Sequence, residues 1–334
     1  MCANERNRPT VKDIANALNL SVSTVSRALN KKGKLKPNTI KSIEYKAKEM
    51  GYLPNYIARS LKSNITYTVG AIIPDITNPI FPKYARGILD SAVKKGYQVY
   101  MLNSDMNIEK EKAALESLLS KRVDGLILTS TNLSDKELSA LRDKDIPFVV
   151  TRREIKVPGV SYVDVNNFYG GYIAGNYLIK QGRKKIAFIG SRFSGEPAQK
   201  RLKGFIKAIE KYNMEVDKRL IIEGETSIEG GYVAAKEAYE KGADSIFAYN
   251  DIMAIGALTF ASEQNLRLPE DFSIIGFDDI YLSSLPFIKL TTIRQPMYYI
   301  GSKAFSVLLH LMTSKNFKAY KVWIKPELVI RKTA

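Results

Sequence analysis

From residue 68 onward, short apolar runs rich in β-branched residues alternate with longer amphipathic segments, and this alternation limits the possible folds more than any other feature. The first run, 69–74, is typical of a buried strand, and the segment 81–95 after it has the period of a helix. A helix between two strands allows them to lie parallel in a right-handed βαβ unit. The same pattern predicts strands at 98–102, 125–129 and 148–151 and helices at 109–122 and 135–144.

A second series of the same kind begins near Ser161. It predicts helices at 168–181, 198–212, 228–241 and 253–263 and strands at 185–189, 220–223, 245–248 and 273–276. A last helix at 299–312 precedes a single terminal strand at 322–330. Two doubly wound parallel-sheet subdomains fit this arrangement most simply. Ligands of open α/β sheets bind beyond the carboxyl ends of the strands, so we expect a site between two subdomains that face each other.

Polar residues stand where several of the expected strands end. Such side chains can contact a ligand, but they also cap helices and form turns, so the pattern leaves both roles open for each of them. They are Asp75, Asn78, Thr129, Ser130, Arg152, Arg153, Asn250, Asp251, Asp278 and Asp279.

The first thirty residues show a different pattern, two short helices joined by a tight turn. Thr10 is placed to cap the first helix together with Asp13, and Ser21 is placed to cap the second. The second helix has one apolar and one polar face, with Val25, Ala28 and Leu29 against Val22, Ser23, Ser26 and Arg27. Short polar groups and an arginine on a small helix suit the DNA major groove, although an ordinary pair of surface helices has the same pattern.

A third helix completes a small head. It follows a basic loop at 31–36, starts at Pro37 and closes at Gly51. Three such helices are too small a unit to bind DNA tightly as a monomer. Pro54 then starts a segment with room for about two helical turns, which is marginal as an isolated helix in water. This segment is either a plain linker or a short helix that is ordered when something holds it.

The distribution of charge indicates an anionic partner for the head. The chain carries a net charge of +17, and residues 1–63 hold 13 Lys and Arg against 4 Asp and Glu. More than half of the excess therefore lies in the first fifth of the chain, as expected of a unit that neutralises DNA phosphates.

The chain lacks the residues that several other functional classes require. The single cysteine, Cys2, excludes an internal disulfide framework, and the single histidine, His310, removes most zinc and histidine-based catalytic sites. The glycine-bearing segment 190–195 has neither the P-loop nor the dinucleotide spacing. The first eight residues lack the apolar core of a signal peptide, and no apolar run reaches membrane-spanning length. We expect a cytoplasmic protein that is not an enzyme and has no cofactor, metal or membrane partner.

Taken together, these features resemble the lactose-repressor (LacI/GalR) family of bacterial transcription regulators, over residues 9–331. The resemblance rests on motifs in family order at 11–15 (VKDIA), 22–30 (VSTVSRALN), 51–59 (GYLPNYIAR), 123–127 (VDGLI), 250–256 (NDIMAIG), 275–279 (IGFDD) and 290–295 (LTTIRQ). It implies an all-α helix-turn-helix head and an α/β core like that of periplasmic sugar-binding proteins. The implied limits are 1–53 for the head, 54–64 for a hinge helix and linker, 65–163 with 293–321 for the N-terminal core subdomain, and 164–292 with 322–334 for the C-terminal one.

The resemblance also implies which residues contact DNA. Val22, Ser23 and Arg27 take the base-reading positions, and Leu61 matches the hinge leucine that wedges into the minor groove. Arg27 is the strongest candidate, because a guanidinium can pair with guanine O6 and N7 or hold a phosphate. The implied partner is a near-palindromic operator in double-stranded DNA, bound by a homodimer. The interface residues are Thr10, Ser21, Val22, Ser23, Thr24, Ser26, Arg27, Asn30, Asn55, Ile57, Ala58 and Leu61.

A sugar or sugar-derived effector is implied between the two core subdomains. Arg201 matches the arginine that grips sugar hydroxyls in sugar-responsive members, and Asp278 would accept hydrogen bonds from vicinal hydroxyls. The residues assigned to this cleft are Phe81, Thr129, Arg152, Arg201, Thr226, Asn250, Asp278 and Gln295.

Arg152 departs from the family pattern, since many sugar-binding members have an aspartate there. A guanidinium in place of a carboxylate changes the local charge by two units and adds hydrogen-bond donors. Our hypothesis is an anionic effector, a sugar phosphate or sugar acid, paired with Arg152 and Arg201. The alternative is that Arg152 turns to the surface or forms a salt bridge between the subdomains.

The expected function is a ligand-responsive repressor of genes for carbohydrate metabolism or uptake. Segments 74–78, 103–105 and 295–301 also resemble the catabolite control protein, whose corepressor is a phosphorylated carrier protein. Arg201 argues mildly against that branch, because a pocket arginine is not needed when the main partner docks outside the pocket. A sugar-binding protein without DNA function would share the core but lack the basic head and the hinge.

Overall fold

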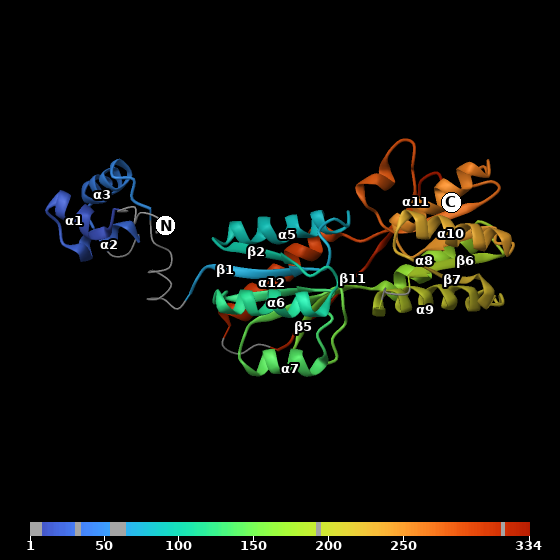
Figure 1. Cartoon of the computed structure of the whole chain (residues 1–334), viewed down its shortest axis with the longest axis horizontal. Coiled ribbons are helices and arrows are strands. Elements are labelled where there is room, and N and C mark those ends of the chain that lie inside the picture. The colour runs from blue at the N-terminus through green and yellow to red at the C-terminus, as the bar shows by residue number, and fades with distance from the viewer. Residues whose placement is uncertain (1–8, 31–34, 54–64, 192–194, 315–317) are drawn as a thin grey trace, which may run out of the picture. The chain divides into compact units, whose positions relative to one another are not determined.

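The structure is a computed structural model and describes residues 9–30, 35–53, 65–191, 195–314 and 318–334 (Figure 1). These residues divide into two compact units, one within 1–66 and one within 67–334. Within the described ranges, each helix is too short or too polar to cross a lipid bilayer.

The first unit is a head of three short helices, α1 (Val11–Leu18), α2 (Val22–Leu29) and α3 (Pro37–Glu49). Each helix contributes apolar residues to one small core, in which Ile14, Val25 and Ile43 have no exposed surface. This confirms the three helices expected from the apolar spacing.

Local hydrogen bonds set the ends of the head helices. Thr10 and Asp13 form a capping box at α1, and the Ser21 hydroxyl accepts a hydrogen bond from the Thr24 amide at α2. Asn19 ends α1 in the left-handed conformation, with φ of 50°, which a short polar side chain tolerates better than most residues do. The tight turn between the two helices follows from this residue.

The second unit begins with a parallel sheet of six strands in the order β11-β5-β4-β3-β1-β2. Its strands are β1 (Thr68–Ile73), β2 (Gln98–Asn103), β3 (Gly125–Thr129), β4 (Phe148–Thr151), β5 (Ser161–Val165) and β11 (Lys321–Ile324). Its helices are α5 (Phe81–Lys94), α6 (Ile108–Ser120), α7 (Asp135–Asp143) and α12 (Met297–Thr313). We call this sheet and its helices the N-lobe.

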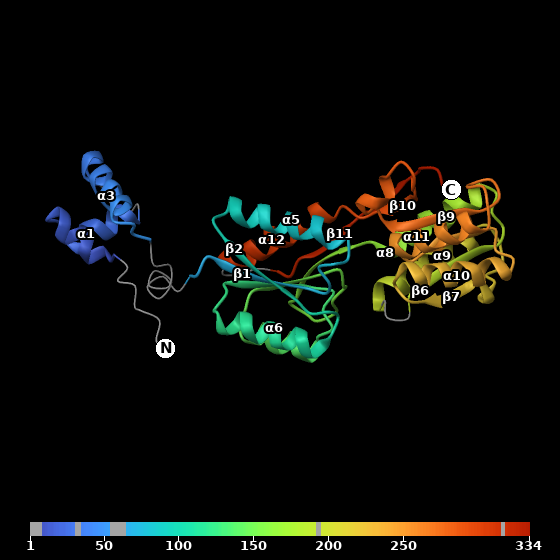
Figure 2. The same cartoon turned by 45° about the horizontal axis from the view of Figure 1, so that its top comes forward.

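Both faces of the N-lobe sheet are covered. Ala71 and Ile73 of β1 pack toward α5 and α12, whereas Ile72 packs toward α6 and α7. Figures 1 and 2 show α5 and α12 side by side on one face and α6 on the other. Burial on both faces explains why the strands are continuous apolar runs rather than alternating ones.

The second sheet, also of six strands, has the order β12-β10-β9-β8-β6-β7. Its strands are β6 (Ile186–Ser191), β7 (Ile221–Gly224), β8 (Ser245–Ala248), β9 (Ser273–Asp278), β10 (Thr291–Arg294) and β12 (Glu327–Val329). Its helices are α8 (Asn167–Lys180), α9 (Gly195–Lys211), α10 (Ile228–Glu240) and α11 (Asp251–Glu263), with short turns η1 (Lys218–Leu220) and η2 (Tyr281–Ser284). We call it the C-lobe. Helices α10 and α11 pack on one face and α8 and α9 on the other.

The end of the chain differs from the expected single strand at 322–330. It forms β11 in the N-lobe sheet and β12 in the C-lobe sheet, where β12 pairs antiparallel with β10. Pro326 lies between them, and proline has no N–H with which to continue a ladder. The expectation of one strand was therefore wrong.

The chain passes between the lobes three times, after β5, after β10 and after β11. The expected subdomain limits at 163, 292 and 321 fall slightly before these crossings, because β5 stays in the N-lobe sheet to Val165, β10 in the C-lobe sheet to Arg294, and β11 in the N-lobe sheet to Ile324. Several expected ligand residues lie at or just after the carboxyl ends of strands, among them Arg152 after β4, Asp278 at the end of β9 and Gln295 after β10.

Candidate functional site

The outer face of α2 presents the residues expected to read DNA. Val22 is 48% exposed and Ser23 and Arg27 are exposed, whereas Val25 and Ala28 are buried in the head core. This arrangement separates a packing face from a face that is available to a partner.

Several other residues expected to contact DNA form hydrogen bonds within the head. The Ser21 hydroxyl caps α2 and lies 2.9 Å from the Ser23 hydroxyl and 2.8 Å from that of Thr24. Asn30 donates to the Ser26 carbonyl, at 2.7 Å. Thr10 donates its hydroxyl and amide hydrogens to the Asp13 carboxylate, and these hydrogen bonds lower the pKa of that carboxyl. The hinge residues Asn55, Ile57, Ala58 and Leu61 lie outside the described residues.

In the core, a chain of contacts joins expected effector residues from both lobes. Arg152, directly after β4, donates from Nη1 to Gln295 Oε1 at 3.3 Å. Gln295, directly after β10, donates from Nε2 to Asp278 Oδ1 at 2.6 Å. Asp278 Oδ1 lies 4.0 Å from Arg201 Nη2 of α9. The structure thus brings together four residues that are far apart in the sequence.

Arg201 is held rigidly on the C-lobe. Its side chain is 1% exposed, with Nε donating to Asn167 Oδ1 at 2.9 Å and Nη1 to the Tyr249 carbonyl at 2.6 Å. Its guanidinium lies 3.5 Å from the ring centre of Phe277 and 4.7 Å from that of Tyr249. Burial lowers the pKa of Arg201, and the nearby Asp278 carboxylate counteracts part of this shift. Only Nη2 is directed at the expected ligand acceptor Asp278.

Arg152 is held less completely. Its backbone is left-handed, with φ of 60°, and its guanidinium lies 5.4 Å from the ring centre of Phe81. Besides Gln295, Nη1 contacts only Met297 Sδ, at 3.5 Å, among the described residues. The Nε atom is buried and has no hydrogen-bond partner within the described part of the chain. Arg152 therefore faces the other expected effector residues rather than the surface.

Two aspartates at expected strand ends, Asp251 and Asp278, are both buried. Asp251 accepts from Thr292 Oγ1 at 2.5 Å, from Ser283 Oγ at 2.6 Å and from the Ile280 amide at 3.0 Å. Burial, reinforced by the charge of Asp278, raises the pKa of Asp251 to about 7. Burial also raises the pKa of Asp278, and the cations Arg201 and Arg152 oppose that shift. Through the hydrogen bonds from Ile280 and Ser283, Asp251 stabilises the loop that follows Asp278.

Phe81 and Thr129 join the same neighbourhood through Tyr84. The Tyr84 hydroxyl lies 3.0 Å from Thr129 Oγ1 and 2.7 Å from Thr151 Oγ1, and its ring meets that of Phe81 edge-on at 6.5 Å. Burial raises the pKa of Tyr84 to about 12, so this hydroxyl stays protonated.

The last two expected effector residues behave differently. Asn250 is buried and caps α11, its side-chain oxygen accepting from the Met253 amide at 2.9 Å. Thr226 is exposed in the turn between β7 and α10, and no contact among the described residues joins it to the other seven.

Sequence reasoning missed the residues that support the cleft. Asn167 orients Arg201 and Tyr84 orients Thr129, but both meet their partners only through tertiary packing. Asp164 of β5 is 3% exposed, and burial raises its pKa to about 6 while the nearby cations Arg152 and Lys200 oppose the shift. Its position inside an apolar strand was the one signal that could have singled it out.

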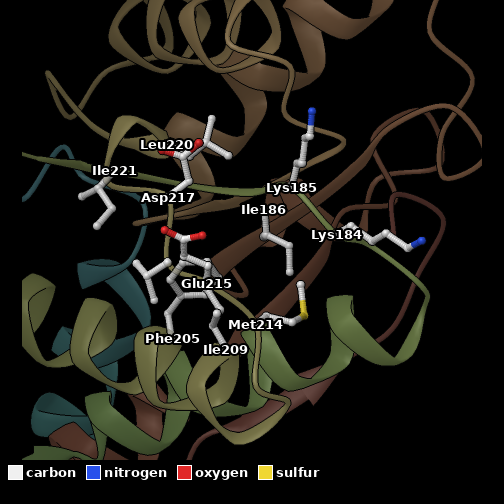
Figure 3. Close-up of a pocket in the computed structure, with 11 residues that line it drawn as sticks. Lys184, Lys185, Ile186, Phe205, Ile209, Met214, Glu215, Asp217, Leu220 and Ile221 are labelled. Carbon is white, nitrogen blue, oxygen red and sulfur yellow. The ribbon is translucent and has the colours of Figure 1, made fainter.

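The core has two cavities to consider, and expected effector residues line only one of them. One, of about 280 Å³, lies where the chain passes between the lobes and is lined partly by Asp278, Gln295 and Met297. The other, shown in Figure 3, lies in the C-lobe near the start of β6 and is lined partly by Lys185, Phe205 and Met214. Its volume of about 50 Å³ is too small for a sugar, and none of the expected effector residues lines it.

Comparisons with known proteins cover both units. Residues 66–332 match the family model described as periplasmic binding proteins and sugar binding domain of LacI family, and residues 10–55 match that of bacterial regulatory proteins, lacI family. The chain is 32% identical over 327 residues to the HTH-type transcriptional repressor PurR of Mannheimia succiniciproducens, covering 97% of this chain and 98% of the relative.

Two solved structures cover nearly the whole chain. The lac repressor dimer bound to operator and the anti-inducer ONPF has 25% identity and a TM-score of 0.88, covering 98% of this chain and 99% of that one. The complex of the transcriptional regulator CelR with cellobiose has 26% identity and a TM-score of 0.74, covering 98% and 100%. The match of the head argues against a sugar-binding protein that has no DNA function.

Proposed function

Because the chain belongs to the LacI family of bacterial regulatory proteins, we propose that it is a dimeric repressor whose operator affinity is controlled by a small ligand bound between the two lobes. It is a DNA-binding transcription regulator and not an enzyme. Its targets are genes of carbohydrate metabolism or uptake, and it acts in the cytoplasm, where its operator is.

Operator recognition rests on α2. Two heads of a dimer insert this helix into successive major grooves of a near-palindromic site, with Val22, Ser23 and Arg27 facing the bases. The exposed face of α2, separate from its packing face, supports this proposal. The hinge residues, with Leu61 as the minor-groove wedge, complete the interface.

Effector binding rests on the contact chain from Arg152 through Gln295 and Asp278 to Arg201, the observation that carries the proposal most directly. It joins an N-lobe segment to a C-lobe helix, so a ligand placed there contacts both lobes. Buried donors and acceptors around aromatic rings suit a sugar-derived ligand, which presents hydroxyls at its edge and C–H groups on its faces. The cellobiose complex of the similar regulator CelR supports the same ligand class.

The effector carries an anionic group that meets Arg152. In the described residues, no carboxylate lies within ion-pair distance of this guanidinium, whereas Arg201 has Asp278 at 4.0 Å. Within the described part of the chain, the Nε atom of Arg152 is a buried donor without a partner, and such a donor costs roughly 1–3 kcal/mol. A carboxylate or phosphate oxygen would satisfy Nε and place a negative charge within ion-pair distance of the guanidinium.

The test combines calorimetry with DNA binding. Gluconate, glucose 6-phosphate and neutral glucose, cellobiose and ribose are titrated into the full chain and into Arg152→Ala, with Arg86→Ala on the exposed face of α5 as control. We expect an acidic sugar to bind to wild type and the control but about tenfold or more weaker to Arg152→Ala. Tight binding of a neutral sugar that Arg152→Ala leaves unchanged would contradict the anionic effector.

The DNA arm starts from operators selected out of random duplexes with the full chain. Failure to enrich a palindromic sequence, both without and with a phosphorylated carrier protein, would contradict the proposed operator recognition. Operator binding that appears only with a phosphorylated carrier protein would favour the catabolite-control type of regulation instead.

A further inference from the structure

Lys200 of α9 contacts three side chains at the edge of the cleft. Its Nζ lies 2.6 Å from Glu154 Oε2, 2.8 Å from Glu196 Oε1 and 4.8 Å from the ring centre of Trp323. Glu154 and Trp323 belong to the N-lobe, whereas Lys200 and Glu196 belong to the C-lobe. A single ammonium group therefore links the lobes through an ion pair and an aromatic face.

This link differs from the other ion pairs of the core. Among the ion pairs of the described residues, the one between Lys200 and Glu154 alone joins the two lobes. Both side chains are partly buried, 21% and 32% exposed, so water screens the pair less than a fully exposed one. Trp323 adds an apolar support, because its ring also packs edge-on against Tyr162 at 5.5 Å.

The link is next to the expected effector contacts on both sides. Lys200 precedes Arg201 on α9, and Glu154 follows Arg152 by two residues on the same segment after β4. A ligand that draws Arg152 and Arg201 together, or holds them apart, must also move Lys200 relative to Glu154. The bridge and the ligand therefore act on the same two segments.

We propose that Lys200 is a latch that holds the two lobes in one relative arrangement, through Glu154 and the face of Trp323. Its regulatory consequence rests on the proposed function: by biasing the lobes, the latch sets how strongly the effector must bind to change operator affinity.

The latch can be tested without a ligand, because Trp323 is the only tryptophan of the chain. Acrylamide quenching of its fluorescence is measured in full-length wild type, Glu154→Gln, Lys200→Met and the double variant. Glu154 has no described contact with Trp323, so a rise in quenching in Glu154→Gln reports that Lys200 has left the ring. We expect about a twofold or larger rise in each single variant and no further rise in the double variant.

Lys207→Met is the matched control. Lys207 lies on the same helix, but its ion pair with Glu210, at 3.3 Å, stays within α9 and is exposed. Its quenching should equal that of wild type. Equal quenching in Glu154→Gln and wild type would overturn the latch.

A second measurement reports the lobes themselves. In a Cys2→Ser background, spin labels are attached at Lys136→Cys on α7 and Lys236→Cys on α10, both exposed positions in different lobes. The distance distribution between them should broaden or shift in Glu154→Gln and Lys200→Met and stay unchanged in Lys207→Met. Identical distributions in all variants would overturn the latch, whether or not the chain binds an operator. If wild type binds no operator, that result would instead contradict the proposed function.

Discussion

At the residue scale, buried ionisable side chains in the core form hydrogen bonds with partners from distant segments. Asp251 receives three hydrogen bonds from residues 280, 283 and 292, and Arg201 receives support from Asn167 and Tyr249. These hydrogen bonds fix the positions of Asp251 and Arg201 in the core. Arg152 differs, because its Nε is buried and lacks a partner in the described part of the chain, as does Nε of Arg183.

Asp251 should make stability depend on pH. Its pKa is raised from 3.8 to about 7 in the folded chain, so folding favours the protonated form. The stability gained in this way is fully present below about pH 4 and is lost as the pH rises through about 7. Calorimetric melting of wild type should therefore show a decrease of several degrees between pH 5.5 and pH 8.

Asp251→Asn is neutral throughout this range and should melt with less dependence on pH. The control Asp143→Asn, at the exposed end of α7, should melt like wild type. A pH dependence that is the same in wild type and in Asp251→Asn would show that another group is responsible.

Arg27 should contribute sequence-specific affinity. A bidentate contact with guanine is worth about 1–3 kcal/mol, so Arg27→Ala should weaken binding of the selected operator by roughly 5- to 150-fold. Fluorescence anisotropy on operator and scrambled duplexes measures this. Lys48→Ala on α3 is the control for loss of positive charge. An equal loss on both duplexes would indicate a phosphate contact instead.

At the element scale, the packing of α8 against α9 places Arg201. Glycines allow the two helices to approach closely, because a Cβ at Gly171 would lie 1.9 Å from the Arg201 carbonyl oxygen and one at Gly204 would lie 1.9 Å from the Phe168 carbonyl oxygen. Both contacts are with backbone, which cannot yield as a flexible side chain does. The position of Arg201, a proposed effector contact, therefore depends on two residues that have no side chain.

Gly171→Ala should separate α8 from α9 and displace Arg201. We expect effector affinity to fall by about tenfold or more and stability to fall by about 1–3 kcal/mol, as for other overpacked sites. Calorimetric titration and thermal melting measure the two effects. The exposed substitution Lys180→Ala, at the end of α8, should change neither. An unchanged effector affinity in Gly171→Ala would contradict the role of this contact.

The sequence predicted the helices and strands better than it predicted the contacts between them. Helical and strand periodicity predicted α1 to α3 and the parallel strands of both sheets, because these patterns depend on local spacing. It did not predict that β11 and β12 belong to different sheets, although Pro326 marks the break. The support of Arg201 by Asn167, and of Thr129 by Tyr84, depends on packing between residues far apart in the chain. No local pattern could have predicted it.

At the scale of the whole molecule, recognition and ligand binding belong to separate units, so regulation requires a connection between them. The head is one compact unit and the two lobes form the other, and residues 54–64 join them in the sequence. The proposed hinge helix in this segment is short, and a short helix is stable only when other contacts hold it.

Leu61→Ala should therefore weaken specific operator binding while leaving non-specific binding nearly intact. A wedge in the minor groove acts only on the bent specific complex, whereas non-specific affinity comes from phosphate contacts. Binding isotherms on operator and non-operator DNA over a series of salt concentrations separate the two. A proportional loss on both would count against the wedge.

The two sites must also influence each other equally. If effector binding changes operator affinity by some factor, operator binding changes effector affinity by the same factor, because both changes measure one coupling free energy, typically about 1–3 kcal/mol. The factor is measured in two independent ways. Effector is titrated into the full chain with and without saturating operator, and operator is titrated into it with and without saturating effector. Loss of the latch in Glu154→Gln should change this factor, since the latch biases the lobes on which both ligands act. Two unequal factors in wild type would mean that a further species, such as a second oligomeric state, takes part in binding.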